Sequence, residues 1–184
     1  VIRRLSQATV LLALVFAVGA GTAVYQVRED SKELRTSFAV LQTSYKTQTP
    51  PLLNSLLDSP ALTNEERMQV RDLIGQFERA PDTQDLQRDT QQLSTSLKGL
   101  RQLLVQTAGN EEISSLDAFR QLKALSYASG ELAAQFYDYN QGVLVWNQRE
   151  RTRVGYLVAS TLRLEKIVMV NPDGSTEFVP TINF

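Results

Sequence analysis

The spacing of apolar residues predicts that most of the chain is α-helical. Leu34, Phe38, Leu41 and Tyr45 follow one another at intervals of four, three and four residues. Residues at these intervals share one face of an α-helix, so this stretch is expected to bury a stripe of side chains against other helices. The stretch Ala8–Tyr25 contains no charged residue and has no polar face, and the helix that it forms is expected to run into this one.

Two prolines interrupt the pattern. Pro50 and Pro51 lack the N–H that a helix interior uses, and their rings clash with the preceding turn. The sequence therefore predicts that the helix breaks here. A short apolar helix over Leu52–Leu57 is expected to follow, begun by Pro51.

Further helical segments follow the prolines. Thr63 and Glu66 form a capping-box pattern that begins the first of them. Its apolar positions are Val70, Leu73, Ile74 and Phe77. A heptad-like seam from about residue 83 to 107 predicts the next helix. The seam consists of Leu86, Leu93, Leu97, Leu100 and Leu104.

A long last helix is expected from about residue 115 past 147. One broad apolar face carries Phe119, Leu122, Leu132, Phe136, Tyr139, Val143 and Trp146. Short connections between the helices predict antiparallel packing in an elongated bundle. Gln and Ser crowd the outer positions, as in "QRDTQQLSTS" (residues 87–96), which is typical of a solvated helix face.

The end of the chain changes to a β pattern. Leu164–Val170 is rich in β-branched residues, and Asn171–Gly174 reads NPDG, with glycine where a turn needs a positive φ. These residues predict a C-terminal β-hairpin. An isolated hairpin is marginally stable in water, so this one is expected to pack on the bundle, a neighbouring copy or another protein.

The expected fold class is mostly α, with an N-terminal transmembrane helix, an elongated antiparallel helical bundle and a short C-terminal β-hairpin. The chain of 184 residues is long enough for one domain of ordinary size. The expected divisions are a membrane anchor over residues 1–27, the bundle over 28–155, and an apolar segment with the hairpin tail over 156–184.

The anchor prediction depends on Ala8–Tyr25, a stretch without a charged residue. About 18 residues rise roughly 27 Å as a helix, just enough to span a hydrocarbon core. Arg3 and Arg4 precede this stretch. By the positive-inside rule the N-terminus is cytoplasmic and residues 28–184 lie outside.

Two other interpretations of Ala8–Tyr25 stay open. The small residues Gly21–Ala23 before Val24 are compatible with cleavage of a secretory signal. A buried helix of a soluble domain is the other interpretation, and the lack of a polar face argues against it. The length of the segment favours the uncleaved anchor.

Composition narrows the chemistry. The net charge of −1 gives no indication of nucleic-acid binding through bulk charge. The chain has no Cys and no His, which excludes disulfides, thiolate nucleophiles, Cys-ligated metals and the Ser-His-Asp triad. We therefore expect no enzymatic activity, no catalytic residue, no cofactor, no metal and no nucleic-acid partner. An enzyme that uses carboxylates, Lys or Tyr is the least favoured alternative.

Two aromatic–Asn pairs lie seven residues apart in the last expected helix. They are Tyr139-Asn140 and Trp146-Asn147, in "YNQGVLVWN". With Val143 between them, they fit the pattern Tyr-Asn-x-x-Val-x-x-aromatic-Asn. This pattern resembles the signature near the end of the long last helix of the LemA family, which normally has Tyr-Asn twice.

A second stretch is also similar to that family. "SYKTQTPPLLNSLL", with Pro50, Pro51 and Asn54, looks like its second signature, a proline-marked break before an Asn-Leu-containing apolar stretch. The chain departs from the family at Gln135 and Phe136, where members usually have Arg or Lys, and it lacks their Phe-Pro after the second pair. The resemblance implies a bacterial, single-span membrane protein with a helical-bundle domain, and it brings no catalytic residue or cofactor.

The aromatic–Asn motif has two interpretations. Tyr139 and Trp146 share a helix face, so their rings are expected to fill the bundle core. The amides of Asn140 and Asn147 are then expected to bond the backbone groups left free at the proline break. A ligand groove lined by these aromatic rings and amides is the alternative.

The C-terminal tail is the candidate interaction segment. Its apolar residues are Tyr156, Leu157, Ile167, Met169, Phe178 and Phe184. The expected function is a LemA-type scaffold, anchored in lipid through Ala8–Tyr25 in the bacterial cytoplasmic (inner) membrane, with its soluble domain on the periplasmic side. The tail is expected to contact other subunits or a second copy in a homo-oligomer. The alternative is a ligand-binding, sensor-like bundle outside the membrane.

Overall fold

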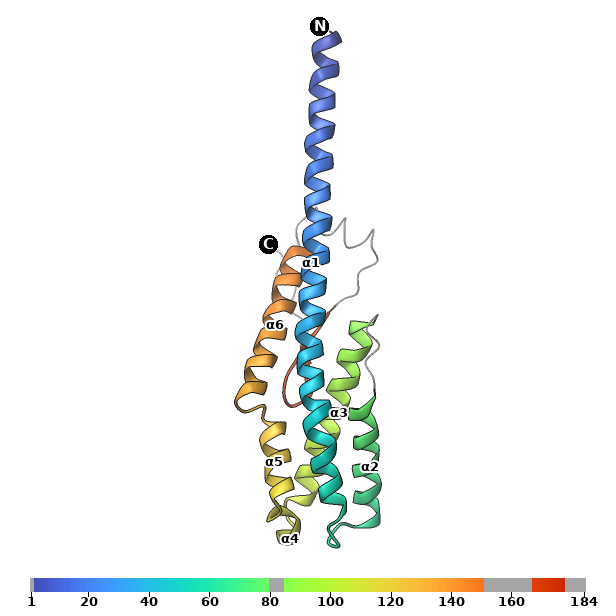
Figure 1. Ribbon diagram of the computed structural model, residues 1–184, viewed down its shortest axis with the longest axis vertical. Helices are drawn as coiled ribbons and strands as arrows, with labels where there is room; N and C mark the ends of the chain where they lie inside the picture. Colours follow the sequence, from blue (N-terminus) through green and yellow to red (C-terminus); the bar gives the residue numbers. More distant parts are fainter. Residues whose placement is uncertain (1, 80–84, 151–166, 178–184) are drawn as a thin grey trace.

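The computed structural model describes residues 2–79, 85–150 and 167–177, and the side chains of 2–17, 20, 149 and 150 lie outside the described part. The elements are α1 (Ile2–Leu57), α2 (Asn64–Glu78), α3 (Leu86–Thr107), α4 (Glu111–Ser114), α5 (Asp117–Ser126), α6 (Glu131–Glu150), β1 (Met169–Val170) and β2 (Thr176–Glu177). Figure 1 shows an elongated bundle with its long axis along α1. The prediction of a mostly helical bundle is confirmed.

The helices run antiparallel around one apolar core. α1 packs against α2 and α5, and α3 packs against the same two helices, which closes a four-helix ring. α6 continues in the direction of α5 and packs along α1 above this ring. In each helix the apolar residues recur every three or four positions. This spacing places them on the side of the helix that faces the core. Leu41, Leu53, Leu56, Leu100 and Leu103 have no exposed surface.

The prediction that α1 breaks at the prolines is wrong. Pro50 and Pro51 lie inside α1, which continues to Leu57. Their missing N–H groups leave two helical hydrogen bonds unmade, but the apolar stripe continues through them. Burial on both sides of the prolines therefore holds the helix together. The fully buried residues on this stretch are Tyr45, Thr49, Leu53 and Leu56.

The long last helix expected from about residue 115 is divided into α5 and α6, so the prediction of one continuous helix is also wrong. Ala128 and Gly130 have positive φ angles of 45° and 66°, which an α-helix does not allow. The carbonyl of Leu125, at the end of α5, accepts a hydrogen bond of 3.0 Å from the Tyr45 hydroxyl. A side chain of α1 therefore binds the chain where α5 ends.

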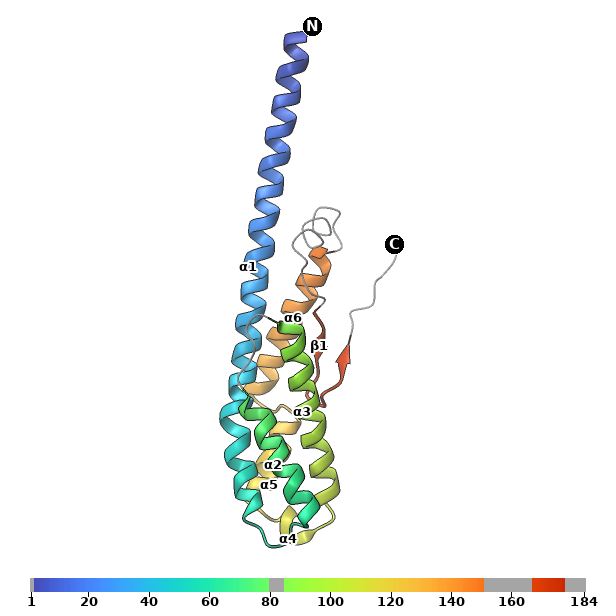
Figure 2. The ribbon, with the colours of Figure 1, turned by 90° about the vertical axis from the view of Figure 1, so that its right-hand side faces the viewer.

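The N-terminal part of α1 extends beyond the bundle as a single helix (Figures 1 and 2). Val27 is the first described residue of α1 that is buried, whereas Val18 and Tyr25 are 61% and 66% exposed. Over the residues that the structure describes, no helix has the length and apolar character needed to cross a membrane. Most side chains of Ala8–Tyr25 lie outside that description, so the anchor stays a prediction.

The structure contains the C-terminal hairpin. β1 pairs antiparallel with β2, Met169 opposite Glu177 and Val170 opposite Thr176. Gly174 has a φ of 78°, as its turn position requires. Of the candidate interaction residues, Tyr156, Leu157, Phe178 and Phe184 lie outside the described residues.

Arg67 fixes the connection between α1 and α2. Its Nη1 donates to the Leu57 carbonyl at 2.8 Å, its Nη2 to the Ser59 carbonyl at 2.6 Å, and its Nε to the Leu62 carbonyl at 3.3 Å. The Thr63–Glu66 capping box, which is present as predicted, begins α2 directly after this loop. One guanidinium thus satisfies carbonyls that the end of α1 leaves unbonded.

We expect Arg67→Met to lower the free energy of unfolding by about 1–3 kcal/mol, because it removes donors from partly buried carbonyls. Urea denaturation monitored by circular dichroism measures the change. Arg71→Met, at an exposed position on the same helix, is the matched control and is expected to change the value by less than about 0.5 kcal/mol. Equal losses in the two variants would contradict the role given to Arg67.

Candidate functional site

Tyr139 lies in the core between α1 and α6. It has no exposed surface, and its ring centroid lies 5.3 Å from that of Phe38 on α1. Val143 and Trp146 follow on the same face of α6, with exposed fractions of 0% and 5%. Trp146 is the only tryptophan of the chain. Its indole N–H has no hydrogen-bond partner among the described residues.

Asn140 binds the backbone of the C-terminal strand. Its Nδ2 donates to the Val170 carbonyl at 3.0 Å, and its Oδ1 accepts from the Val170 N–H at 3.1 Å. The side-chain amide thus makes both bonds that a residue on a neighbouring β-strand would make. Val170 is fully buried, so its N–H and carbonyl need these partners.

The Tyr139 hydroxyl binds the same strand. It donates to the Val168 carbonyl at 2.9 Å and lies 3.2 Å from the Thr90 hydroxyl of α3. Each hydroxyl carries one proton. Tyr139 gives its proton to the Val168 carbonyl, and Thr90 can give its own either to Tyr139 or to the Leu86 carbonyl of α3, which lies 2.6 Å away. Burial raises the pKa of Tyr139 to about 12, although the hydrogen bond with Thr90 acts in the opposite direction.

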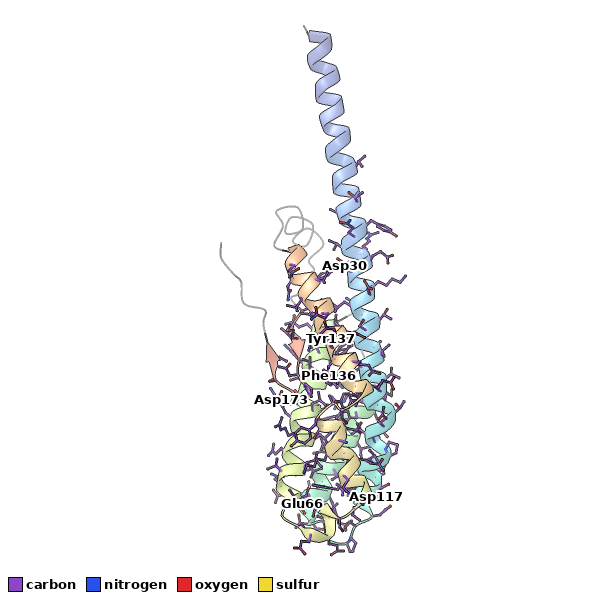
Figure 3. All side chains as sticks on the ribbon, turned by 90° about the vertical axis from the view of Figure 1, so that its left-hand side faces the viewer. Asp30, Glu66, Asp117, Phe136, Tyr137 and Asp173 are labelled. Atoms are coloured by element: carbon purple, nitrogen blue, oxygen red, sulfur yellow. The ribbon has the colours of Figure 1, made fainter. Side chains whose placement is uncertain are left out.

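α3 holds the turn of the hairpin. The Ser94 hydroxyl donates to the Gly174 carbonyl. A Cβ atom on Gly174 would lie 2.5 Å from the Ser94 carbonyl oxygen and 2.8 Å from the Lys98 nitrogen, so only glycine fits here. Asp173, labelled at the turn in Figure 3, lies 3.9 Å from the Arg101 guanidinium. Hydrogen bonds from Ser175, together with Arg101, lower the pKa of Asp173.

Together these residues form a groove, the tail groove, made by Thr90 and Ser94 of α3 and by Tyr139 and Asn140 of α6. Figure 2 shows β1 beside α6, with α3 next to it. The groove makes four hydrogen bonds to the hairpin, and each of them ends on a main-chain atom. Residues 167–177, the docked hairpin, occupy the tail groove, which holds them through their main chain and buries the side chains of Ile167, Val168 and Val170.

This geometry corrects the interpretation of the amides. Asn140 bonds Val170 and not the proline break. Tyr139, next to Asn140, packs on Phe38 of α1, and Pro50 lies twelve residues further along α1, about 18 Å away along the helix axis. Asn147 lies further still from the prolines on α6 and is half-buried.

The proline part of the predicted packing motif lies elsewhere. Pro50 is buried, while Pro51 and Asn54 are exposed on α1. Tyr139, Asn140, Val143 and Trp146 belong to the other part of the bundle, where α6 packs on α1. The structure therefore does not bring the two predicted signatures together into one site.

The candidate interaction tail is docked on its own bundle. Ile167 is 6% exposed, Val168 5% and Val170 0%, and Met169 is half-buried against the same core. Of the three surfaces on which the hairpin was expected to pack, the bundle itself is the one seen in the structure. The same docking argues against a ligand groove between the aromatic rings and the amides, because β1 fills that space.

The sequence interpretation missed Thr90 and Ser94. Both belong to the stretch interpreted as a solvated face, yet Thr90 is 0% and Ser94 4% exposed. Thr90 can also bond the Leu86 carbonyl of its own helix at 2.6 Å, so its burial leaves no hydroxyl without a partner. The available signal was the spacing of four residues, which places both hydroxyls on one side of α3.

Comparison with family models, with curated proteins and with solved structures gives no match. The similarity to the LemA family thus depends on the two motifs around Tyr139 and Pro50. Among the described residues there is also no group of three or more acidic side chains that could hold a metal ion. The chain's own contacts are the remaining guide to its function.

We expect wild-type stability to fall between pH 10 and pH 12. The pKa of Tyr139 is raised to about 12 in the folded state, and an unfolded tyrosine titrates near 10. In this window the unfolded chain releases the proton and the folded chain keeps it, so unfolding is favoured as pH rises. The difference reaches about 2–3 kcal/mol at pH 12 and is absent below pH 10.

Urea denaturation of the wild type and of Tyr139→Phe at each pH measures this effect. Below pH 10 the two stabilities are expected to differ by a constant, which reflects the lost hydrogen bond. Above pH 10 the wild type is expected to lose stability faster than the variant. Parallel curves up to pH 12 would show that Tyr139 titrates in the folded chain as it does in the unfolded one.

We expect Asn140→Leu to release the docked hairpin, because both bonds to Val170 disappear while the volume stays similar. The backbone amide of Val170 is then expected to exchange its hydrogen at least about tenfold faster, in line with the loss of 1.4 kcal/mol or more. Hydrogen exchange followed by NMR measures this rate. Asn147→Leu, two turns away on the same helix, is the matched control, and acceleration by both variants alike would contradict the specific role of Asn140.

Proposed function

We propose that the chain is a membrane-anchored helical scaffold of the LemA type, which lies in a bacterial cytoplasmic membrane and acts by binding other proteins or further copies of itself. Ala8–Tyr25 is the lipid-spanning segment in this proposal. The bundle stands on the outer side of the membrane, and the N-terminus lies in the cytoplasm.

The observation that carries this proposal is the extension of α1 beyond the bundle. Up to Tyr25 the described side chains of this helix are exposed or partly exposed. The charge-free stretch Ala8–Tyr25 forms part of the same helix. An apolar helix without a packing partner would expose a large hydrophobic surface in water, and a bilayer is the environment that covers such a surface on all sides.

Charges at the two ends support the orientation. Arg3 and Arg4 lie on one side of the stretch, and Arg28, Glu29 and Asp30 on the other. The excess of positive charge belongs to the N-terminal side, which the positive-inside rule places in the cytoplasm. Exposed Tyr25 would lie at the interface between lipid and water, where tyrosine is enriched.

The docked hairpin, which occupies the tail groove, favours the scaffold proposal over the ligand-binding alternative. The tail groove holds the chain's own backbone, so no structural observation favours the sensor-like alternative. The outer surface of the bundle is available to partners and includes the exposed apolar side chains of Met68, Val105 and Tyr137. Such isolated apolar residues are common on surfaces, so they do not by themselves identify a partner.

We expect the full-length protein, expressed in a bacterium, to stay in the membrane fraction after a carbonate wash. Phe16→Arg, at the centre of the charge-free stretch, is expected to shift much of it to the soluble fraction, because a central arginine costs about 2.5–3.5 kcal/mol of insertion free energy. Val40→Arg is the matched control, since Val40 lies on the same helix but is exposed beside the bundle. Immunoblots of both fractions give the readout.

Two further observations complete this test. The intact mass of the membrane-bound form distinguishes an anchor from a signal cleaved before Val24, which would lack the preceding residues. Protease added outside intact spheroplasts is expected to digest the bundle. Wild-type protein found entirely in the soluble fraction, with an uncleaved mass, would refute the anchor.

A further inference from the structure

We propose that the tail groove of one copy binds the docked hairpin of a second copy, so that two chains associate by exchanging residues 167–177. The partner surface is the groove formed by Thr90, Ser94, Tyr139 and Asn140. The occupant is the same strand and turn that the structure places there within one chain. This inference rests on the proposed scaffold function, for which it names the partner and the surface, and it does not depend on the membrane anchor.

The chemistry of recognition is the first argument. The hairpin is held by four hydrogen bonds to main-chain atoms and by burial of Ile167, Val168 and Val170. None of these contacts depends on which chain supplies the strand. An exchanged pair would therefore have the same groove contacts as the single chain. The main free-energy cost of association would be the loss of translational and rotational freedom of the two molecules.

The dependence of the hairpin on the groove is the second argument. β1 and β2 pair through only two residues each. A pairing of this length is marginal in water. When the hairpin leaves its groove, its buried apolar side chains and the Val170 N–H and carbonyl lose their partners. A vacated groove on a second copy supplies the same partners again.

The length of the connection is the third argument. Residues 151–166 form a connection of sixteen residues between α6 and the docked hairpin. Sixteen residues can span up to about 55 Å. Tyr139, which binds Val168, lies eleven residues before the end of α6, or about 17 Å along the helix. The number of residues between the two elements therefore does not confine the hairpin to its own bundle.

Concentration decides between the two arrangements. Because groove and hairpin belong to one chain, the groove meets a high effective concentration of its own hairpin, so a dilute chain is expected to remain closed. When many copies lie close together, the concentration of hairpins from other copies rises, and exchange is favoured. If the groove is weakened in one chain and the hairpin in another, neither chain can close on itself. The only intact pairing is then between the hairpin of the first chain and the groove of the second.

Gly174→Ala disables the hairpin, because its Cβ would collide with backbone atoms of Ser94 and Lys98, while the groove stays intact. Asn140→Leu disables the groove and leaves the hairpin intact. Gly130→Ala is the matched control for the glycine variant. Gly130 also has a positive φ, but a Cβ there meets nothing within 4 Å.

The experiment mixes full-length Gly174→Ala and Asn140→Leu chains in mild detergent. The chain has no native cysteine, so Val105→Cys, at an exposed position on α3, carries a donor dye in one chain and an acceptor dye in the other. We expect energy transfer and sedimentation to show at least about tenfold more mixed dimer than either variant forms alone. The Gly130→Ala chain mixed with Asn140→Leu is expected to show no such gain, because its own hairpin occupies its groove.

Circular dichroism and the emission of Trp146 verify that each variant keeps its helices and its core. If Asn140→Leu fails this check, Tyr139→Phe takes its place as the groove variant. Absence of mixed dimer from two folded variants at high concentration would overturn the proposal. Binding of a free peptide of residues 165–179 to the Gly174→Ala chain without mixed dimer would also overturn it, since the groove would then accept free peptides and not a second copy.

Discussion

The pair of hydrogen bonds between the Asn140 amide and Val170 is the interaction on which the upper half of the bundle depends. A strand placed in an apolar core must bond its N–H and carbonyl groups, because an unbonded buried peptide group costs several kcal/mol in an apolar medium. Helices have no free backbone groups along their sides to offer. A side-chain amide has one donor and one acceptor in the required geometry, so a helix that presents Asn140 can take the place of a neighbouring strand.

Two buried tyrosines act in a similar way at different levels of the bundle. The Tyr45 hydroxyl of α1 binds the Leu125 carbonyl where α5 ends, and the Tyr139 hydroxyl of α6 binds the Val168 carbonyl just before β1. In each case the ring fills the core and the hydroxyl donates to a carbonyl; the Leu125 carbonyl also accepts from the Ala128 N–H in the turn that ends α5. Aromatic contacts connect the levels, because Tyr45 packs on Phe136 and Tyr139 on Phe38. Irregular backbone is thus tolerated inside the core wherever a tyrosine reaches it.

The sequence predicted the features that local periodicity and capping determine, and it did not predict those that depend on contacts distant in the chain. The stripe before the prolines, the Thr63 capping box and the Asn171–Gly174 turn are all local, and the structure contains each of them. The continuation of α1 through Pro50 depends on burial against α2 and α5, which no window of the sequence includes. Sequence periodicity also gave no reason to divide the last helix at Ala128.

The candidate site shows the same division. The sequence singled out Tyr139 and Asn140, and periodicity placed the ring in the core. The partner of Asn140 is thirty residues away on a separate element, so spacing alone could not identify it. The burial of Thr90 and Ser94 was not predicted because hydroxyl-rich helix surfaces are usually solvated. Thr90 meets Tyr139 of α6 and Ser94 meets Gly174 of the turn, and both partners are distant in the sequence.

The unbroken α1 also determines how motion passes through the molecule. Its 56 residues form a rod about 84 Å long, in which the bundle occupies one end. Since the helix continues through both prolines, tilting the N-terminal end by about ten degrees would sweep Leu57 through about 15 Å if the rod stays rigid. The molecule is in this sense a lever, whose far tip amplifies any small reorientation of the end that is held.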